Sequence, residues 1–400
     1  MQYRIVPKNG DKLSALGFGC MRLPQRGLAI NQDRAIQQIR FAIDRGVNYL
    51  DTAPMYHNGE SETLLGKALA DGYRGKVKVA TKLSHFVLRK PEGMAKMLDT
   101  SLQKLNTNYV DYYLLQGLDL GSWNKLQEFN VLDFLDRAEA EGKILNTGFS
   151  FHGTLTTFKE IIDANDWTNC QIQYNFVDED LQAGTEGLKY AASKNVAVMI
   201  MEPLRGGTLA NKLLKGVEQI YRGASPQRSA AEWGLRWVWN HPEVTVVLSG
   251  MNDERHITEN LHTAETALPN SMNADELATV SRVADAYKRL IKVPCTGCGY
   301  CMPCSQGVNI PSNFQFYNQH FLPGSKMQSR VFYAFLLMGV GPLGEKAGDA
   351  SLCIECGKCA KHCPQHIAVP TELKSVKEAL GGWQTKLMIP LVKRFLPKPT

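Results

Sequence analysis

The stretch NYLDTAPMYHNGESETLLGKALADGYRGKVKVATK, residues 48–82, contains one complete strand–helix–strand repeat. Residues 48–52 and 77–82 are short apolar runs, the pattern of strands that are buried on both faces. Residues 60–70, between them, have the spacing of an amphipathic helix. This unit predicts a parallel sheet with helices packed on its outside.

The same alternation continues from about residue 15 to residue 266. Strands are predicted at 15–19, 48–52, 77–82, 110–115, 146–149, 170–174, 196–201 and 244–248, and helices include 33–45, 60–70, 91–104, 126–141, 184–193 and 226–241. Ser225 and Pro226 predict the start of the last of these helices, as an N-cap and a first-turn proline. Eight units in about 250 residues are typical of a (β/α)8 TIM barrel. A doubly wound sheet is the alternative, disfavoured because no strand precedes a convincing dinucleotide-binding glycine fingerprint.

The composition is that of an ordinary globular protein. Of the 400 residues, 44% are hydrophobic and 21% are charged, and the net charge of +6 is spread along the chain. These values argue against disorder, and the spread charge does not indicate a nucleic-acid partner. No apolar run is long enough for an export signal or a membrane span. We therefore expect a cytoplasmic protein without a transmembrane segment.

Eight of the ten cysteines fall in two tight groups near the C-terminus. The first group is Cys295, Cys298, Cys301 and Cys304, and the second is Cys353, Cys356, Cys359 and Cys363. In the absence of an export signal, such spacing predicts metal ligation rather than disulfides. The second group, followed by Pro364, has the spacing of the bacterial ferredoxin run that binds [4Fe–4S] clusters.

The crossed pairing of such runs predicts two [4Fe–4S] clusters. One cluster would be held by Cys295, Cys298, Cys301 and Cys363, and the other by Cys353, Cys356, Cys359 and Cys304. Zinc is the alternative, although four cysteines in one short run are crowded for a zinc site, which normally takes two separated pairs. The 48-residue spacer contains helical patterns at 311–321 and 325–338, so we predict a small α-helical ferredoxin-like domain. The expected division is a barrel at 1–290, this domain at 291–380 and a tail at 381–400.

Three ionisable residues of the barrel lie where strands end. Asp51 ends the second predicted strand, Tyr56 lies in the following loop and Lys82 ends the third strand. The carboxyl ends of the strands form the catalytic face of such a barrel. A phenol keeps its proton at neutral pH, and a neighbouring ammonium lowers its pKa and favours proton donation. These residues are therefore candidates for a proton-donor site; the alternatives are a turn or helix cap at Asp51 and a solvated strand end at Lys82.

Seven motifs in this order resemble the aldo/keto reductase family. They are GFGCMRL (17–23), LDTAPMYHNGESE (50–62), VATKL (79–83), DYYLLQ (111–116), QYN (173–175), PLRGG (203–207) and SGMNDERHITENL (249–261). With the cysteine groups, the chain resembles the branch of predicted oxidoreductases that carry a fused C-terminal 4Fe–4S dicluster domain. The resemblance implies that Tyr56 is the general acid, Lys82 its modulator and Asp51 the partner of Lys82. Gln116 stands where the family usually has a histidine that orients the substrate carbonyl, so Gln116 could bind the carbonyl but not relay a proton.

The resemblance also implies an NADP or NAD site. For the nicotinamide its residues would be Ser150, Gln173 and the loop of Pro203, Leu204 and Gly207. Ser249, Gly250 and Asn252 would bind the phosphates, and His256, Glu259 and Asn260 would lie toward the adenosine. The family has asparagine where this chain has Phe151. Arg255 and His256 are near the position that would choose between the coenzymes, but neither is decisive.

The two halves of the chain allow two hypotheses. The first is an NAD(P)H-dependent reductase of a small carbonyl compound or an activated double bond, with clusters for electron delivery, sensing or structure. The second is an electron-transfer or adaptor protein, which passes single electrons to a redox partner and whose barrel has lost carbonyl reduction. Nicotinamide transfers two electrons as hydride whereas a cubane accepts one, so direct coupling is awkward without a mediator. A flavin mediator stays open, although no flavin motif is recognisable.

Overall fold

A computed structural model of the chain describes residues 1–27, 29–211, 213–295, 297, 301–339, 346–363 and 366–394. Eight parallel strands close into a barrel in which neighbours in the chain are also neighbours in space. The strands are β3 (Leu16–Gly19), β6 (Tyr49–Asp51), β7 (Lys78–Leu83), β8 (Tyr112–Leu118), β9 (Thr147–Phe151), β10 (Asn169–Gln173), β11 (Ala197–Met201) and β12 (Val244–Ser249). The predicted TIM barrel is confirmed.

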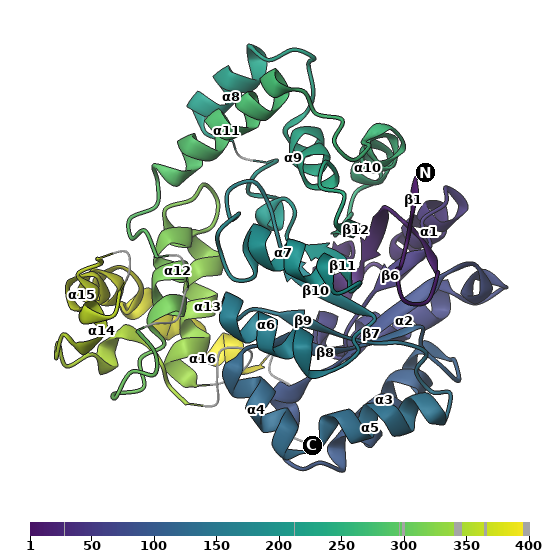
Figure 1. Cartoon of the computed structure of the whole chain (residues 1–400), viewed down its shortest axis with the longest axis horizontal. Helices are drawn as coiled ribbons and strands as arrows, with labels where there is room; N and C mark the ends of the chain where they lie inside the picture. Colours follow the sequence, from purple (N-terminus) through teal and green to yellow (C-terminus); the bar gives the residue numbers. More distant parts are fainter. Residues whose placement is uncertain are drawn as a thin grey trace.

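Helices surround the barrel strands (Figure 1). They are α1 (Gln32–Asp44), α2 (Glu60–Ala68), α3 (Gly93–Leu105), α4 (Leu120–Glu128), α5 (Val131–Ala140), α6 (Leu155–Ala164), α7 (Gly184–Ser193), α8 (Lys215–Arg222), α9 (Ala230–Trp239), α10 (Glu254–Thr266) and α11 (Ala274–Lys288). At the N-terminus, β1 (Tyr3–Ile5) and β2 (Lys12–Ser14) form an antiparallel hairpin. Val6 and Leu13 of this hairpin share a buried cluster with Tyr49 and Tyr112, so the hairpin covers the amino ends of the barrel strands. Short strands β4 (Gln25–Arg26) and β5 (Ala29–Ile30) form a second hairpin after β3.

Two helix predictions were wrong in detail. The helix expected at 126–141 is interrupted at Asn130, whose φ of 54° ends α4 and begins α5. The helix expected to start at Pro226 starts at Ala230 instead, because Ser229 is the residue whose side chain accepts the N-capping hydrogen bond, from the amide of Glu232. A serine before a proline was therefore a misleading start signal here.

The pairing of the strands determines which side chains share the carboxyl end of the barrel. Asp51 lies opposite Ala80, and Lys82 lies opposite Leu114, two residues before Gln116. Because parallel strands end on the same face of the barrel, the carboxyl ends of β6, β7 and β8 lie side by side and can line one site.

The C-terminal part of the chain is an α-helical module beside the barrel (Figure 1). Its helices are α12 (Ile310–His320), α13 (Lys326–Met338), α14 (Lys358–Lys361), α15 (Val369–Leu380) and α16 (Trp383–Arg394). The module has its own buried core, which includes Phe314, Tyr333 and Leu373. Asn318 fastens it to the linker by donating to the carbonyl of Val293 at 2.7 Å, and α16 packs on α13. The division at residues 290 and 380 stays a prediction.

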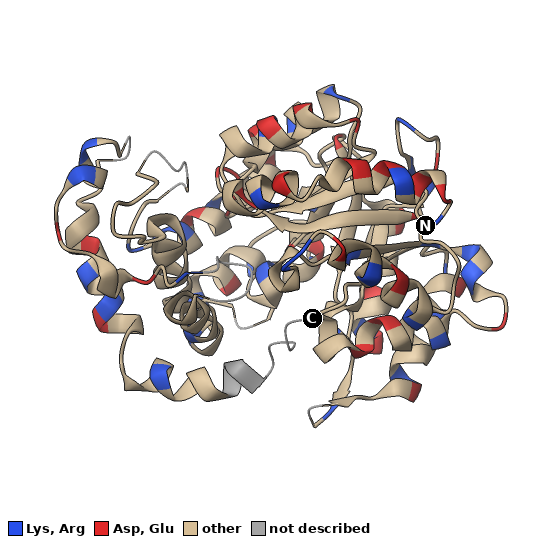
Figure 2. Cartoon of the chain, turned by 90° about the horizontal axis from the view of Figure 1, so that it is seen from below, with Lys and Arg blue, Asp and Glu red and all other residues tan. Residues whose placement is uncertain are grey.

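Basic and acidic residues alternate over the helices of the barrel (Figure 2). This distribution agrees with a net charge that is small and dispersed. Among the helices that the structure describes, none combines the length and the apolar character needed to cross a membrane.

Candidate functional site

Asp51, Lys82 and Tyr56 meet at the carboxyl end of the barrel. The Nζ atom of Lys82 lies 2.7 Å from each carboxylate oxygen of Asp51 and 2.9 Å from the carbonyl oxygen of Thr52. The Tyr56 hydroxyl is 3.3 Å from the same nitrogen. The Lys82 side chain is 1% exposed, so this ammonium is surrounded by protein rather than by water. The structure thus brings together the three residues that the sequence predicted.

The charges of this cluster favour a protonated phenol beside a cation. Burial lowers the pKa of Lys82, but the charge of Asp51 and the contacts with Asp51 and Tyr56 outweigh it, so the net shift is upward. Burial raises the pKa of Tyr56, and the Lys82 charge opposes this shift. Burial likewise raises the pKa of Asp51 against the opposing effect of Lys82. At neutral pH the cluster therefore holds a phenol that has its proton and an ammonium that can stabilise the phenolate.

Hydrogen bonds connect the start of helix α2 to the strands that carry Asp51 and Lys82. Ser61 contacts the Thr52 hydroxyl at 2.8 Å and donates to the carbonyl of Cys20 at 3.1 Å. The adjacent Glu62 accepts a hydrogen bond of 2.6 Å from Thr81, and burial raises the pKa of this carboxyl. These bonds hold the residues that follow Asp51 and precede Lys82 against the helix that follows Tyr56, so buried contacts support the geometry of the cluster.

Gln116 lies at the end of β8, next to these residues. The Ser84 hydroxyl donates to Oε1 of Gln116, which turns the amide nitrogen away from that contact. The Ser150 hydroxyl accepts a hydrogen bond of 2.8 Å from the amide of Gly117. Ser84 was not among the predicted site residues, although its place two residues after Lys82 at a strand end could have indicated it. The Gln116 amide oxygen therefore has a protein donor, and its role as an acceptor is already taken by Ser84.

A carboxylate that was not among the predicted site residues connects several residues of the predicted nicotinamide site. Asp178 accepts a hydrogen bond of 3.0 Å from the Gln173 side chain and another of 3.0 Å from Asn175. Arg205 forms an ion pair with it at 3.3 Å. The Nη1 atom of Arg205 is buried without a hydrogen-bond partner. Asp178 therefore joins Gln173 to the loop that begins at Pro203.

The loop after β11 and the end of β12 lie close together. Arg205, Gly206 and Gly207 have positive φ values of 50°, 64° and 91°. The Arg22 side chain reaches this loop, because a β-carbon added to Gly206 or Gly250 would meet it at 2.9 Å and 3.0 Å respectively. The loop can therefore present both backbone amides and guanidinium groups to an anion.

The other predicted coenzyme residues have diverse surroundings. Asn260 donates to the Ser249 hydroxyl at 3.0 Å, and Glu259 accepts a hydrogen bond from Ser229. Asn252 is exposed and His256 is half-buried. Phe151 is fully buried and packs against Phe158, with ring centroids 5.1 Å apart, so it is part of the core beneath the helices.

Arg255 is 88% exposed and bonded to Asp253, at 3.0 Å. Glu254 is held by Arg34 and Gln38, and the Arg34 hydrogen bond lowers the pKa of this carboxyl to about 2. The start of α10 is therefore occupied by two acidic side chains, which gives no preference for the extra phosphate of NADP.

The described cysteines of the module have surroundings that fit iron–sulfur clusters. The charges of Cys353 and Cys304 both act to raise the pKa of Cys359, so these three thiols from distant segments are neighbours. The amide of Glu355 donates to the Cys353 sulfur at 3.4 Å, and backbone amides also reach the Cys359 sulfur. Amide donors to thiolate are one of the protein's means of tuning a cluster.

The first set of cysteines is described only in part. Cys295, Cys301 and Cys363 are partly buried at the edge of the module core, whereas Cys298 lies outside the described residues. Within the described ranges no three Cys, His, Asp or Glu side chains gather as the ligands of one metal ion would. A cubane binds each thiolate at a separate corner, so it does not require such convergence.

The module contacts the carboxyl face of the barrel through two loops. A β-carbon added to Gly297, within the first cysteine group, would be 3.5 Å from the Leu181 side chain. The hydroxyls of Thr208 and Ser325 are 3.3 Å apart, and Leu322 of the module is buried in the barrel core. The first cysteine group therefore adjoins the loop that contains Asp178, on the side where the coenzyme is predicted to bind.

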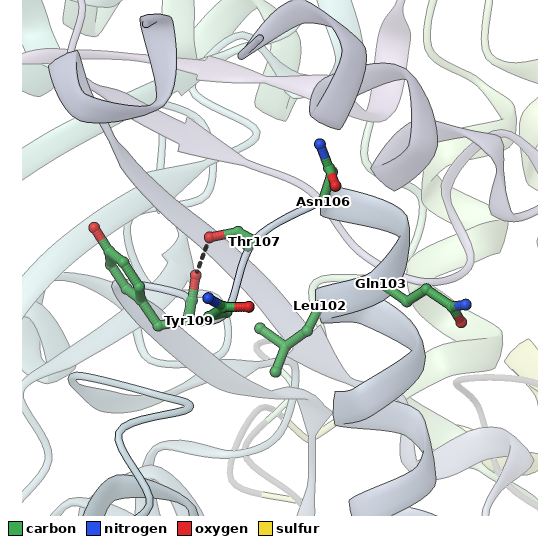
Figure 3. A pocket seen from close by; sticks show the side chains of 6 residues that line it. Leu102, Gln103, Asn106, Thr107 and Tyr109 are labelled. Carbon is green, nitrogen blue, oxygen red and sulfur yellow. Dashed lines mark hydrogen bonds between the residues drawn. The ribbon is translucent and has the colours of Figure 1, made fainter.

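A shallow hollow lies on the opposite face of the barrel (Figure 3). Leu102, Gln103, Asn106, Thr107, Asn108 and Tyr109 line it, between the end of α3 and the start of β8. The Thr107 hydroxyl donates to the Tyr109 carbonyl at 3.0 Å, which closes the turn. The amino ends of barrel strands generally serve stability, so the hollow is separate from the candidate site.

Comparison with protein families finds two matches along the chain. The model of the aldo/keto reductase family matches residues 15–277, and that of a 4Fe-4S dicluster domain matches residues 294–368. L-galactose dehydrogenase from Arabidopsis thaliana is 25% identical over 309 residues, covering 72% of this chain and 96% of that protein. Methylglyoxal reductase YeaE from Escherichia coli is 26% identical over 298 residues, covering 72% and 97%.

Solved structures have the same barrel. The holo form of aldo-keto reductase AKR11C1 from Bacillus halodurans has a TM-score of 0.60 at 22% identity, and covers 71% of this chain and 96% of its own. An aldo-keto reductase from Klebsiella pneumoniae in complex with NADPH has a TM-score of 0.59 at 23% identity, with coverages of 71% and 95%. At these identities the likeness shows the fold.

Proposed function

The chain belongs to the aldo/keto reductase family of oxidoreductases, and from this we propose that it reduces a small carbonyl compound or an activated double bond with NAD(P)H. One observation carries the proposal: the Tyr56 hydroxyl lies 3.3 Å from a buried ammonium that Asp51 keeps charged. A hydroxyl so placed can donate its proton to an oxygen that gains negative charge.

In this reaction each residue of the site would have a separate role. Nicotinamide, when bound, supplies a hydride to the carbonyl carbon. Tyr56 donates its proton to the carbonyl oxygen, and the Lys82 charge stabilises the phenolate that remains. The Gln116 amide, oriented by Ser84, donates a hydrogen bond to the same oxygen. Asp51 takes no part in proton transfer and keeps Lys82 charged and in place.

The coenzyme would be held along β9 to β12. Ser150 and Gln173 would contact the carboxamide, although Gln173 must share its amide with Asp178. The loop of Pro203, Leu204 and Gly207 would complete the nicotinamide site, and Ser249, Gly250 and Asn252 would bind the phosphates. The similar aldo-keto reductase from Klebsiella pneumoniae was solved in complex with NADPH, so NADP is the first coenzyme to test.

The module would bind two [4Fe–4S] clusters. The neighbouring thiols of Cys304, Cys353 and Cys359 support the crossed pairing, in which Cys304 completes the cluster of the second group. Cys295, Cys298, Cys301 and Cys363 would hold the other. When bound, clusters supply one-electron transfer beside the coenzyme side of the barrel.

Anaerobic turnover tests this function directly. The reconstituted full chain is mixed with NADPH or NADH and a panel of small aldehydes and enones, and coenzyme absorbance is followed. Oxidation that depends on substrate and is lost in Tyr56→Phe is the expected result. Coenzyme oxidation at equal rates in wild type and Tyr56→Phe would refute the proton-donor role.

A second function, electron transfer to a redox partner, is favoured by Gln116 in place of the usual histidine. Here the clusters would pass single electrons onward and the barrel would only bind coenzyme. Bleaching of the visible cluster absorbance by NAD(P)H alone, without aldehyde turnover, would favour this function. A structured flavin band in the spectrum would identify a mediator.

A further inference from the structure

The loop that carries Tyr56 has an unusual backbone. His57, Asn58 and Gly59, which follow it, have positive φ values of 51°, 57° and 91°. Glycine adopts this left-handed conformation readily, whereas a β-carbon makes it unfavourable. Two successive residues with side chains persist there only when other contacts hold them.

The His57 imidazole makes contacts of this kind. The Leu23 amide donates to Nε2 of His57 at 3.1 Å, and the ring is also hydrogen-bonded to the backbone of Met21. The Gln25 side-chain nitrogen lies 3.4 Å from Nδ1, a van der Waals contact because Nδ1 carries the proton when Nε2 accepts. These partners belong to the segment that follows β3, and Leu23 is buried in the barrel core. The ring therefore ties the Tyr56 loop to a rigid neighbouring segment.

Other bonds hold the two ends of the loop. The Tyr56 amide donates to the Ala53 carbonyl at 3.1 Å, and the Lys104 ammonium donates to the Gly59 carbonyl at 3.0 Å. His57 lies between these attachments and next to Tyr56 in the chain. A change at its side chain would thus be transmitted directly to the phenol.

We propose that His57, with Nε2 unprotonated, is a positioning residue that holds the Tyr56 hydroxyl against Lys82 and toward the substrate oxygen. The inference rests on the proposed role of Tyr56. A neutral imidazole is suited to this task because it accepts at one nitrogen and donates at the other, and so satisfies an amide and a carbonyl of one segment. Glycine would fit the backbone better but would remove the anchor.

Three variants of the reconstituted full chain test the proposal. His57→Leu keeps a bulky side chain without an acceptor, His57→Gln keeps an acceptor for the Leu23 amide, and Asn58→Gly is a control at an exposed left-handed position. We expect His57→Leu to lower kcat by roughly 10- to 100-fold, the effect of a misplaced reacting group, with coenzyme affinity unchanged. His57→Gln should recover most of kcat, and Asn58→Gly should equal the wild type.

A spectroscopic readout separates positioning from general damage. In carbon-13 NMR of tyrosine-labelled protein, the Tyr56 signal is identified by its absence from Tyr56→Phe. In His57→Leu the pH at which this phenol titrates should differ from that of the wild type, because displacement changes both its burial, which raises its pKa, and its distance from the Lys82 ammonium, which lowers it. Thermal unfolding of each variant reports whether it is folded.

Two results would overturn the inference: a kcat of His57→Leu equal to the wild type, or a His57→Gln variant as impaired as His57→Leu. Tyr56→Phe, assayed in parallel, distinguishes the two levels of the proposal. If Tyr56→Phe turns over normally, the proposed function fails. If Tyr56→Phe is inactive and His57→Leu is fully active, only the positioning role fails.

Discussion

Replacement of Lys82 by methionine should make the stability of the barrel depend on pH more strongly than that of the wild type. The substitution keeps most of the side-chain volume and removes the ammonium that lies 2.7 Å from both oxygens of Asp51. The Asp51 side chain is 4% exposed, so water cannot replace the lost partner. The remaining carboxylate is then a buried charge without its counter-ion.

The size of the effect follows from the protonation of Asp51. Removing one partner of a buried ion pair costs about 3–5 kcal/mol, and protonation of the carboxyl relieves part of this cost. Burial raises the pKa of Asp51 even in the presence of Lys82, which opposes the shift, so without Lys82 it lies higher still. Above the unfolded pKa of about 3.9, the folded variant binds one more proton than the unfolded chain. Its stability therefore falls by about 1.4 kcal/mol per pH unit until the folded pKa is reached.

The assay is anaerobic thermal unfolding of the full chain, followed by tryptophan fluorescence at pH 5 and pH 7. Five of the six tryptophans lie in the barrel, so the signal reports mainly on that domain. At about 2–4 °C per kcal/mol, the Tm deficit of Lys82→Met relative to wild type should be larger at pH 7 than at pH 5, by up to about 5–10 °C when the slope holds over both pH units. The double variant Asp51→Leu/Lys82→Met should lose this pH dependence. A deficit that is the same at both pH values, or that persists in the double variant, would refute the reasoning.

Three further predictions concern the site and the module. Tyr56→Phe should lower kcat/KM for aldehyde reduction by about 100- to 10,000-fold, the usual contribution of a general acid, with the coenzyme dissociation constant from fluorescence titration unchanged. Ser84→Ala frees Oε1 of Gln116 from its donor and lets the amide turn, so KM for the carbonyl substrate should rise while the Tm stays near the wild type; an unchanged KM would remove Gln116 from substrate binding. Cys353→Ala should lose iron and visible absorbance, whereas Cys20→Ala, at a buried thiol of the barrel, should keep the full iron content, and equal iron in both would argue against the ligand assignment.

The barrel could be predicted because its strands are continuous apolar runs that are buried on both faces. The sequence pattern predicts helix boundaries less well, because a single residue can determine where a helix begins or ends. Asn130 breaks the helix expected at 126–141 through a backbone conformation that asparagine tolerates but does not require. Ser229 rather than Ser225 caps α9, since the cap depends on which serine has a free helical amide within reach. Such choices depend on the tertiary structure and leave little trace in the sequence.

The core of the site was predictable for a similar reason. Asp51 and Lys82 end adjacent parallel strands, so any closed barrel places them together. The roles of Ser84 and Asp178 depend on contacts with Gln116 and Arg205, which are distant in the chain and are reached only after folding. Phe151 could not be placed from sequence, since its position at the end of a strand allows either an inward or an outward side chain; it packs outward with Phe158.

The position of the module relative to the proton donor constrains how the two halves can cooperate. Tyr56 and Lys82 come from the second and third strands of the closed barrel, whereas the loops after β10 and β11, which contact the module at Leu181 and Thr208, lie across the barrel from them. Electrons from the coenzyme or the module would thus reach a substrate from one side, and the proton of Tyr56 from the other. Asp178, which contacts Gln173 and Arg205, lies three residues before Leu181. If Gln173 and this loop bind the coenzyme as proposed, a shift of these contacts would reach the first cysteine group. Coenzyme and module would then be coupled through one loop in both candidate functions, and the Tyr56 side would distinguish a reductase from an electron carrier.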